Sequence, residues 1–229
     1  MRSDLEIQKD VMDELGWEPS LTPSEIGVAV KGGVVTLSGQ VDSYFKKTIA
    51  EKAAKRVKGV KAIAEEIQIG ASPSYHRSDT DIATAVLNAL KWHTAVEEER
   101  IKVRVEEGIV RLEGEVEWEY QRKNAKAAIE NLNGVIAVIN LIAVKPKLVT
   151  TNIKTSEIKQ KIIAAFQRNA MLDAKRILVK VEENKVTLTG TVRSLAEKDD
   201  AENAAWAAPG VLDVDSKLQV ENPEFIFYE

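Results

Sequence analysis

The sequence predicts an α+β fold made of three tandem αββαβ units, each a small three-stranded mixed sheet with two helices packed on one face. The first observation is a stretch of the form Val-x-Leu-x-Gly-x-Val that occurs three times, starting at Val35, Val110 and Val186. The second is a further glycine twenty positions after the first, at Gly59, Gly134 and Gly210. The third is a change of apolar period from helical to alternating, in the same order in every copy. Repetition at a fixed spacing indicates one supersecondary unit copied in tandem.

The repeats set the expected boundaries of the chain's parts. A unit of about 70 residues has a marginal core when it stands alone, so some packing between units is expected. We assign units to residues 1–70, 79–145 and 155–222, linkers to 71–78 and 146–154, and an aromatic tail to 223–229.

Each unit is expected to begin with a helix. In the first unit Ile7, Val11 and Leu15 recur every four residues and therefore share one helical face. Ser3 and Glu6 have the spacing of a capping box, which marks the start of a helix. Trp17 and Trp92 end this helix in the first two units, where we expect them to cover the unit cores or to form contacts between units.

A hairpin follows the first helix. Ile26, Val28 and Val30 alternate with polar or small residues, which is typical of a strand with one buried face. The turn after this strand ends at Gly33, Gly108 and Asn184, so the single replacement of glycine uses a residue that tolerates positive φ. The repeated stretch then forms the second strand.

An alanine-rich helix and a last strand complete the unit. Ala50, Ala53 and Ala54 form a stripe of small residues that permits close packing on the sheet. Glycine within the repeated stretch predicts a bend or a close approach of backbone, and the later glycine fits the left-handed end of a helix. We expect eight glycines to be required by backbone geometry: Gly33, Gly39, Gly59, Gly108, Gly114, Gly134, Gly190 and Gly210.

The composition excludes several kinds of chemistry. The chain has no cysteine and two histidines, which rules out thiolate sites, disulfides and a histidine-rich metal centre. No phosphate loop, serine-nucleophile elbow, zinc-protease signature or calcium loop is present. We therefore expect no enzymatic activity, no cofactor and no metal. A net charge of −4 does not favour nucleic acid, and a start without an apolar leader leads us to expect a cytoplasmic protein.

Features that the copies do not share are the best candidates for a binding surface. The second helix of the first unit and its flanks are basic, whereas the same helix of the third unit is acidic. Aromatic residues without counterparts occur in the second unit, the third unit and the tail. The candidate lipid or partner surface comprises Lys47, Lys52, Lys55, Arg56, Lys58, Trp118, Tyr120, Trp206, Phe225 and Phe227.

The combined pattern of Ile-x-Val-x-Val, turn glycine, Val-x-Leu-x-Gly-x-Val, alanine-rich helix, Gly-Val and final aliphatic strand resembles the BON domain of bacterial osmotically inducible and transport-associated proteins. The resemblance covers three tandem copies. It implies an αββαβ fold, a role in osmotic or envelope stress, and association with phospholipid. It supplies no common catalytic residues.

Three functions remain open at this point. The first is a non-enzymatic, stress-associated protein that associates weakly with anionic phospholipid surfaces through the basic helix. The second is a protein-interaction or self-assembly module that uses sheet edges, the unmatched tryptophans and the tail. The third is a sensor of a small ligand or ion such as potassium, for which the sequence offers no ligand constellation.

Overall fold

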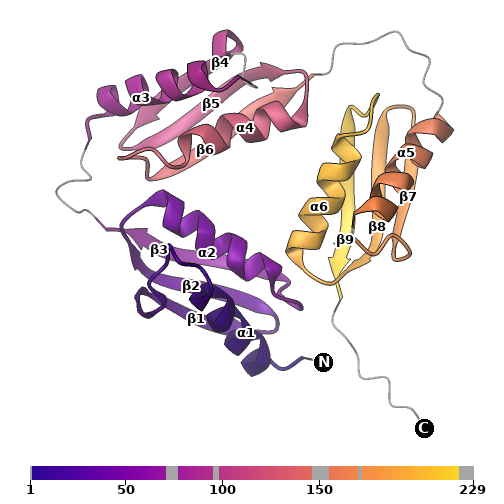
Figure 1. The fold of residues 1–229 in the computed structure, drawn as a ribbon, viewed down its shortest axis with the longest axis horizontal. Helices are drawn as coiled ribbons and strands as arrows, with labels where there is room; N and C mark the ends of the chain where they lie inside the picture. Colours follow the sequence, from indigo (N-terminus) through magenta and orange to yellow (C-terminus); the bar gives the residue numbers. More distant parts are fainter. Residues whose placement is uncertain (1, 71–76, 95–97, 146–154, 170–171, 222–229) are drawn as a thin grey trace. The chain divides into compact units, whose positions relative to one another are not determined.

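The computed structural model describes residues 2–70, 77–94, 98–145, 155–169 and 172–221, and it contains three separate three-stranded sheets (Figure 1). Each sheet belongs to one of the three repeats, which confirms the predicted α+β class. Within each repeat the elements follow in the order helix, strand, strand, helix, strand.

The bounds of the elements agree closely from one repeat to the next. The first repeat comprises α1 (Asp4–Gly16), the short η1 (Pro23–Glu25), β1 (Ile26–Lys31), β2 (Val34–Val41), α2 (Tyr44–Arg56) and β3 (Ala62–Ile69). The second comprises α3 (Asp79–Trp92), η2 (Glu98–Arg100), β4 (Ile101–Glu106), β5 (Ile109–Val116), α4 (Glu119–Ile129) and β6 (Ala137–Val144). The third comprises α5 (Thr155–Arg168), β7 (Ile177–Glu182), β8 (Lys185–Val192), α6 (Leu195–Trp206) and β9 (Asp213–Val220).

The strand that carries the repeated stretch lies in the middle of its sheet. In the second repeat β5 pairs antiparallel with β4 and parallel with β6, and β8 stands in the same relation to β7 and β9. The sheets are therefore mixed, as predicted. A parallel partner requires a crossover connection, and the second helix of each repeat provides it.

The two helices of a repeat pack on one face of its sheet (Figure 1). In the second repeat α3 packs against β4, α4 packs against β6, and the helices touch each other. The core between these layers includes Ile82, Val86, Leu112 and Ile129, all of which are buried. Ala125 lies in the same core, so the alanine stripe of the second helix faces the sheet as predicted.

The capping box predicted at the start of the first helix is present. The Glu6 N–H donates to Oγ of Ser3 at 3.2 Å, and the Ser3 N–H donates to Oε2 of Glu6 at 2.7 Å. These bonds satisfy two backbone donors that a helix start leaves without partners. Ser78 accepts a bond from the Asp81 N–H in the same way at 3.1 Å.

The glycine in the middle of the repeated stretch is required by a close approach of backbone. Gly39, Gly114 and Gly190 have φ values of 128°, 141° and 124°. A Cβ atom added there would lie 2.0 to 2.1 Å from a carbonyl oxygen of Glu25, Arg100 or Arg176, respectively. No side chain fits at such a distance, so the predicted structural role of this glycine is confirmed.

The hairpin turns of the first two repeats take the left-handed conformation at two successive residues, Gly32–Gly33 and Glu107–Gly108. In the third repeat the left-handed residue that the structure records is Glu183, with φ 51°. The prediction that Asn184 takes this role was therefore wrong by one position. Asn184 instead donates from its side-chain amide to the Gly210 carbonyl oxygen at 2.5 Å, which ties the turn to the end of α6.

The tryptophans at the end of the first helix do not cover the cores. Trp17 and Trp92 each expose 82% of their surface, so the prediction that they act as lids was wrong. The cores are filled without them because aliphatic residues on α1 and α3 already face the sheets. Among the described residues, no helix is both long enough and apolar enough to cross a membrane.

Candidate binding surfaces

The buried face of α2 determines which way its basic residues point. Ala50, Ala53 and Ala54 are completely buried, which fixes the orientation of α2 on its sheet. Lys52, Arg56 and the nearby Lys58 are consequently exposed, whereas Lys47 and Lys55 are half-buried. Small residues inside and long cationic residues outside make a helix whose polar face projects well beyond the core.

Several of these cations are paired with acids of the first repeat. Arg56 Nε lies 2.6 Å from Oε1 of Glu14, and its Nη2 also pairs with Glu18. Lys46 pairs with Asp42 at 2.7 Å, and Lys55 pairs with Glu51 at 3.0 Å. In the sequence Asp42 and Glu51 are the acids that lie among these cations, because Glu14 and Glu18 belong to the preceding helix and reach Arg56 only in the fold.

The pairs reduce the positive charge of the surface without cancelling it. Between Asp42 and Lys61 the chain has seven basic and two acidic residues. Counting Glu14 and Glu18, which the fold brings to Arg56, and Asp199, whose Oδ2 lies 3.3 Å from Nζ of Lys55, leaves an excess of two positive charges. Exposed pairs of this kind contribute little to stability, but they lower the field that an anionic ligand meets.

The equivalent helix of the third repeat, α6, is organised around an acid. Glu197 is buried, and its carboxylate accepts bonds from the Arg193 N–H at 2.7 Å and the Asp173 N–H at 3.0 Å. The Arg193 guanidinium also pairs with it at 3.2 Å. Burial acts to raise the pKa of Glu197, but the bonds from Arg193 and Asp173 outweigh it and the pKa is lowered. Glu197 thus fastens the start of α6 to the loop before β7.

The unmatched aromatic residues occupy two kinds of environment. Trp118 and Tyr120 are exposed at the start of α4, where Gln121 Oε1 accepts bonds from the N–H groups of Glu117 and Trp118, both at 3.0 Å. They remain candidates for a partner surface. Trp206 is half-buried and packs against the core of the third repeat, so it serves that core. Phe225 and Phe227 lie outside the described residues.

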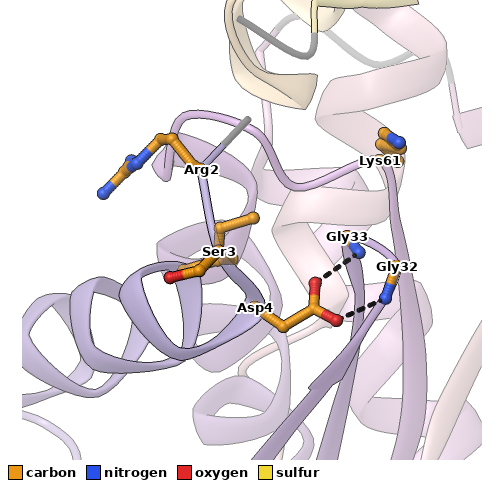
Figure 2. A pocket seen from close by; sticks show the side chains of 7 residues that line it. Arg2, Ser3, Asp4, Gly32, Gly33 and Lys61 are labelled. Atoms are coloured by element: carbon orange, nitrogen blue, oxygen red, sulfur yellow. Dashed lines mark hydrogen bonds between the residues drawn. The ribbon is translucent and has the colours of Figure 1, made fainter. Parts of the chain in front are cut away.

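A carboxylate at the start of the first helix has a role that sequence analysis missed. Figure 2 shows the Asp4 side chain directed at the hairpin turn, where the N–H groups of Gly32 and Gly33 donate to its two oxygens at 2.7 and 3.0 Å. Asp79 binds the N–H groups of Glu107 and Gly108 in the same way, at 2.9 Å each. The signal was present in the sequence, because an acid occupies this position in two repeats and Thr155 occupies it in the third.

The pocket of about 400 Å³ beside Asp4 does not assemble a reactive group. Two of the charged side chains that line it are engaged within the repeat. Asp4 holds the turn, and Arg2 donates to the Lys58 carbonyl oxygen at 3.0 Å and pairs with Asp10. Within the described ranges, no three histidine, aspartate or glutamate side chains gather in a way that could hold a metal ion.

Comparison with known proteins finds a bacterial relative by sequence. It is 29% identical over 150 residues to the Osmotically-inducible protein Y of Escherichia coli (strain K12), a match that covers 62% of this chain and 73% of that protein. Two structures of CdsD, described as a structural protein of the type III secretion system of Chlamydia trachomatis, match at 12% identity with a TM-score of 0.25. The first match covers 92% of this chain and 90% of that structure, and the second covers 96% of this chain and 100% of that structure. A TM-score this low carries no structural argument.

The family assignment rests on all three repeats. The family model described as BON domain matches residues 3–71, 78–146 and 154–222. Each match contains one complete set of helices and strands in the order given above. The chain therefore belongs to the BON domain family, of which it carries three tandem copies.

Proposed function

We propose that this chain is a non-enzymatic binding protein associated with osmotic stress. Two observations support the role: the chain is made of BON domains, and its relative in Escherichia coli is named as osmotically inducible. At the pocket beside Asp4, the side chains of Asp4 and Arg2 are engaged in holding the fold, which supports a role in binding over one in catalysis.

We propose further that it associates weakly with anionic phospholipid surfaces through α2 of the first repeat. The observation that carries this proposal is the excess of two positive charges that remains around α2 after its ion pairs are counted. Basic residues contribute about 1 kcal/mol each when they lie close to an anionic membrane. Two such charges give a weak affinity that is largest at low ionic strength and is lost as salt screens the field.

Vesicle co-sedimentation tests the phospholipid proposal. The full chain is expected to sediment with phosphatidylglycerol-containing vesicles at low salt. It should dissociate from them at about 0.5 M salt, where charges are screened within a few ångströms, and it should not bind phosphatidylcholine vesicles. The variant Lys52→Glu/Lys58→Glu is expected to lose binding. The variant Lys159→Glu/Lys161→Glu, which changes the net charge equally on exposed positions of α5, is the control and is expected to keep it. A wild-type chain that does not bind anionic vesicles at low salt contradicts the proposal.

A further inference from the structure

The open face of the sheet in the second repeat differs from those of the other two repeats. Both helices of this repeat lie on one side of the sheet, where Val110, Leu112 and Ile142 are buried. Alternation therefore turns the intervening residues of each strand to the opposite side. On β6 these are Ala137, Ile139, Leu141 and Ala143, and we call them the β6 strip.

All four residues of the β6 strip are apolar, whereas two of the four matching residues in β3 and all four in β9 are charged or polar. Ile139 exposes 37% of its surface and Leu141 exposes 52%. The residues at the position of Leu141 are Glu66 in β3 and Lys217 in β9. The position of Ile139 is occupied by Ala64 and Asp215, and that of Ala143 by Gln68 and Gln219. The last strand of the second repeat thus presents leucine and isoleucine to solvent where the other two repeats have alanine or charged residues. Large apolar side chains gathered on an exposed face are a candidate interaction surface.

The strands beside the strip carry equal numbers of positive and negative charges on the same face. The pairing places Arg111 beside Ile139 and Glu113 beside Leu141, and β4 follows with Arg104 beside Arg111 and Lys102 beside Glu113. Three bases and three acids face outward from β4 and β5: Lys102, Arg104, Arg111, Glu106, Glu113 and Glu115. Because this face is neutral as a whole, it has no net electrostatic attraction to an anionic membrane or to a strongly charged partner. It suits a surface that carries both signs in equal number, as its own copy does.

The free edge of β6 is less suited to pairing than the face. The Ile142 N–H donates to Oδ1 of Asn140 at 3.2 Å, and Nδ2 of Asn140 donates to the Arg122 carbonyl oxygen at 2.7 Å. In a strand the N–H groups of alternate residues point to the same edge, so Asn140 occupies a donor that a further strand would need. This side chain protects the edge against strand addition, a common device in natural sheets. A partner is therefore directed to the face and not to the edge.

We propose that two copies of this chain associate through the open faces of their second repeats, with the β6 strips in contact. Strands of eight residues in a three-stranded sheet give a face of roughly 25 by 14 Å, or about 350 Å². This is less than half of the roughly 800 Å² per partner that a stable complex buries, so the dimer is weak and forms at high protein concentration. The inference is independent of lipid binding through α2, and it gives self-assembly a defined surface.

Sedimentation velocity of the full chain from ten to several hundred micromolar tests the proposal. The wild type is expected to shift toward twice the monomer mass as concentration rises. Leu141→Glu, which introduces the residue found at this position in the first repeat, is expected to abolish the shift. Leu178→Glu is the control, because Leu178 is 69% exposed on β7 of the third repeat, and it is expected to leave the shift unchanged. Circular dichroism establishes that both variants are folded.

Crosslinking provides a second readout that does not depend on disturbing the strip. The chain has no cysteine, so a single introduced cysteine can form a disulfide only with the same cysteine of a second copy. Ala143→Cys is expected to form a disulfide-linked dimer under mild oxidation, at a rate several-fold above that of Gln219→Cys, the equivalent position of the third repeat. The proposal is overturned by a wild type that stays monomeric at all concentrations, by a dimer that survives Leu141→Glu, or by equal crosslinking of the two cysteines. A further outcome would also overturn it: the wild type binds phosphatidylcholine vesicles and no second copy, and Leu141→Glu does not bind these vesicles.

Discussion

Asp79 and Gly108, which are 29 residues apart in sequence, are joined by a hydrogen bond of 2.9 Å from the Gly108 N–H to Oδ1 of Asp79. The other oxygen of the same carboxylate accepts the Glu107 N–H at 2.9 Å. One side chain at the start of α3 thus fixes both left-handed residues of the β4–β5 turn. The bond connects the helical layer directly to the sheet.

Removing this carboxylate is expected to destabilise the second repeat. Asp79→Ala leaves two turn N–H groups without their charged acceptor, and such bonds contribute about 1.5 to 3 kcal/mol to stability. Because water can replace part of the loss at this exposed turn, we expect a decrease of about 2 kcal/mol in the free energy of unfolding. Urea denaturation of the full chain, with hydrogen exchange to assign the change to the second repeat, measures it.

The third repeat offers the converse experiment. Thr155→Asp places a carboxylate where Asp4 and Asp79 stand in the other repeats, within the part of the chain that the structure describes. If the carboxylate holds the turn as it does elsewhere, this variant raises the stability of the third repeat by about 1 kcal/mol. A decrease after Thr155→Asp, together with no effect of Asp79→Ala, would contradict the assigned role.

The glycine of the repeated stretch should tolerate no side chain. At Gly114 a Cβ atom would lie 2.1 Å from the Arg100 carbonyl oxygen, and φ is 141°. Strain at such a φ and displacement of packed backbone each cost about 1 to 3 kcal/mol, so Gly114→Ala is expected to unfold the second repeat or to lower its midpoint in urea strongly. The control is Gly16→Ala at the end of α1, where nothing lies within 4 Å. It is expected to be neutral or slightly stabilising.

Replacing an exposed tryptophan by alanine should lower the free energy of unfolding much less than replacing a packed one. Trp17→Ala is expected to change the free energy of unfolding by less than about 0.5 kcal/mol, because its side chain is almost fully exposed. Trp206→Ala removes contacts with the core of the third repeat and is expected to cost about 2 kcal/mol. Equal effects of the two substitutions in thermal and urea denaturation would show that the packing described for Trp206 is wrong.

The sequence predicted the order of elements well because each position could be interpreted three times. Apolar spacing on α1, alternation on β1 and the glycine at Gly39 are local signals, and all recur in register. What it did not predict depends on contacts between elements. Glu14 and Glu18 reach Arg56 only after α1 and α2 are packed together, so the basic surface looked more positive than it is.

The same limit explains the remaining differences. Trp17 and Trp206 are both aromatic residues at the end of a helix, and only the fold determines that one is exposed and the other packed. The strip on β6 escaped notice because an alternating apolar strand was expected to bury one face, while Ile139 and Leu141 occupy the other. Comparison of the last strands position by position would have revealed it, since Glu66 and Lys217 stand where Leu141 does.

The positive charge around α2 can also be increased, which should strengthen binding to anionic vesicles. Glu14→Gln/Glu18→Gln removes the two acids that pair with Arg56 and raises the local excess from two charges to four. At about 1 kcal/mol for each charge near an anionic surface, the affinity for phosphatidylglycerol vesicles is expected to increase about thirtyfold at low salt. Glu182→Gln/Glu183→Gln in the third repeat changes the net charge equally and is expected to leave the affinity unchanged. An equal increase in both variants would assign the effect to total charge and not to α2.

Acid should weaken the third repeat through Glu197. The pKa of this carboxyl is lowered in the folded chain, so ionised Glu197 favours folding at pH values above its ordinary pKa of 4.5. That contribution is lost as pH falls through the lowered pKa, because the protonated carboxyl gives up its charge-assisted bonds from Arg193 and the Asp173 N–H. Glu197→Gln is expected to be less stable at pH 7 and to lose less stability than the wild type between pH 5 and 3. Urea denaturation across this range measures both effects, with the exposed Glu183→Gln as the control, and an unchanged acid dependence in Glu197→Gln would remove Glu197 as its source.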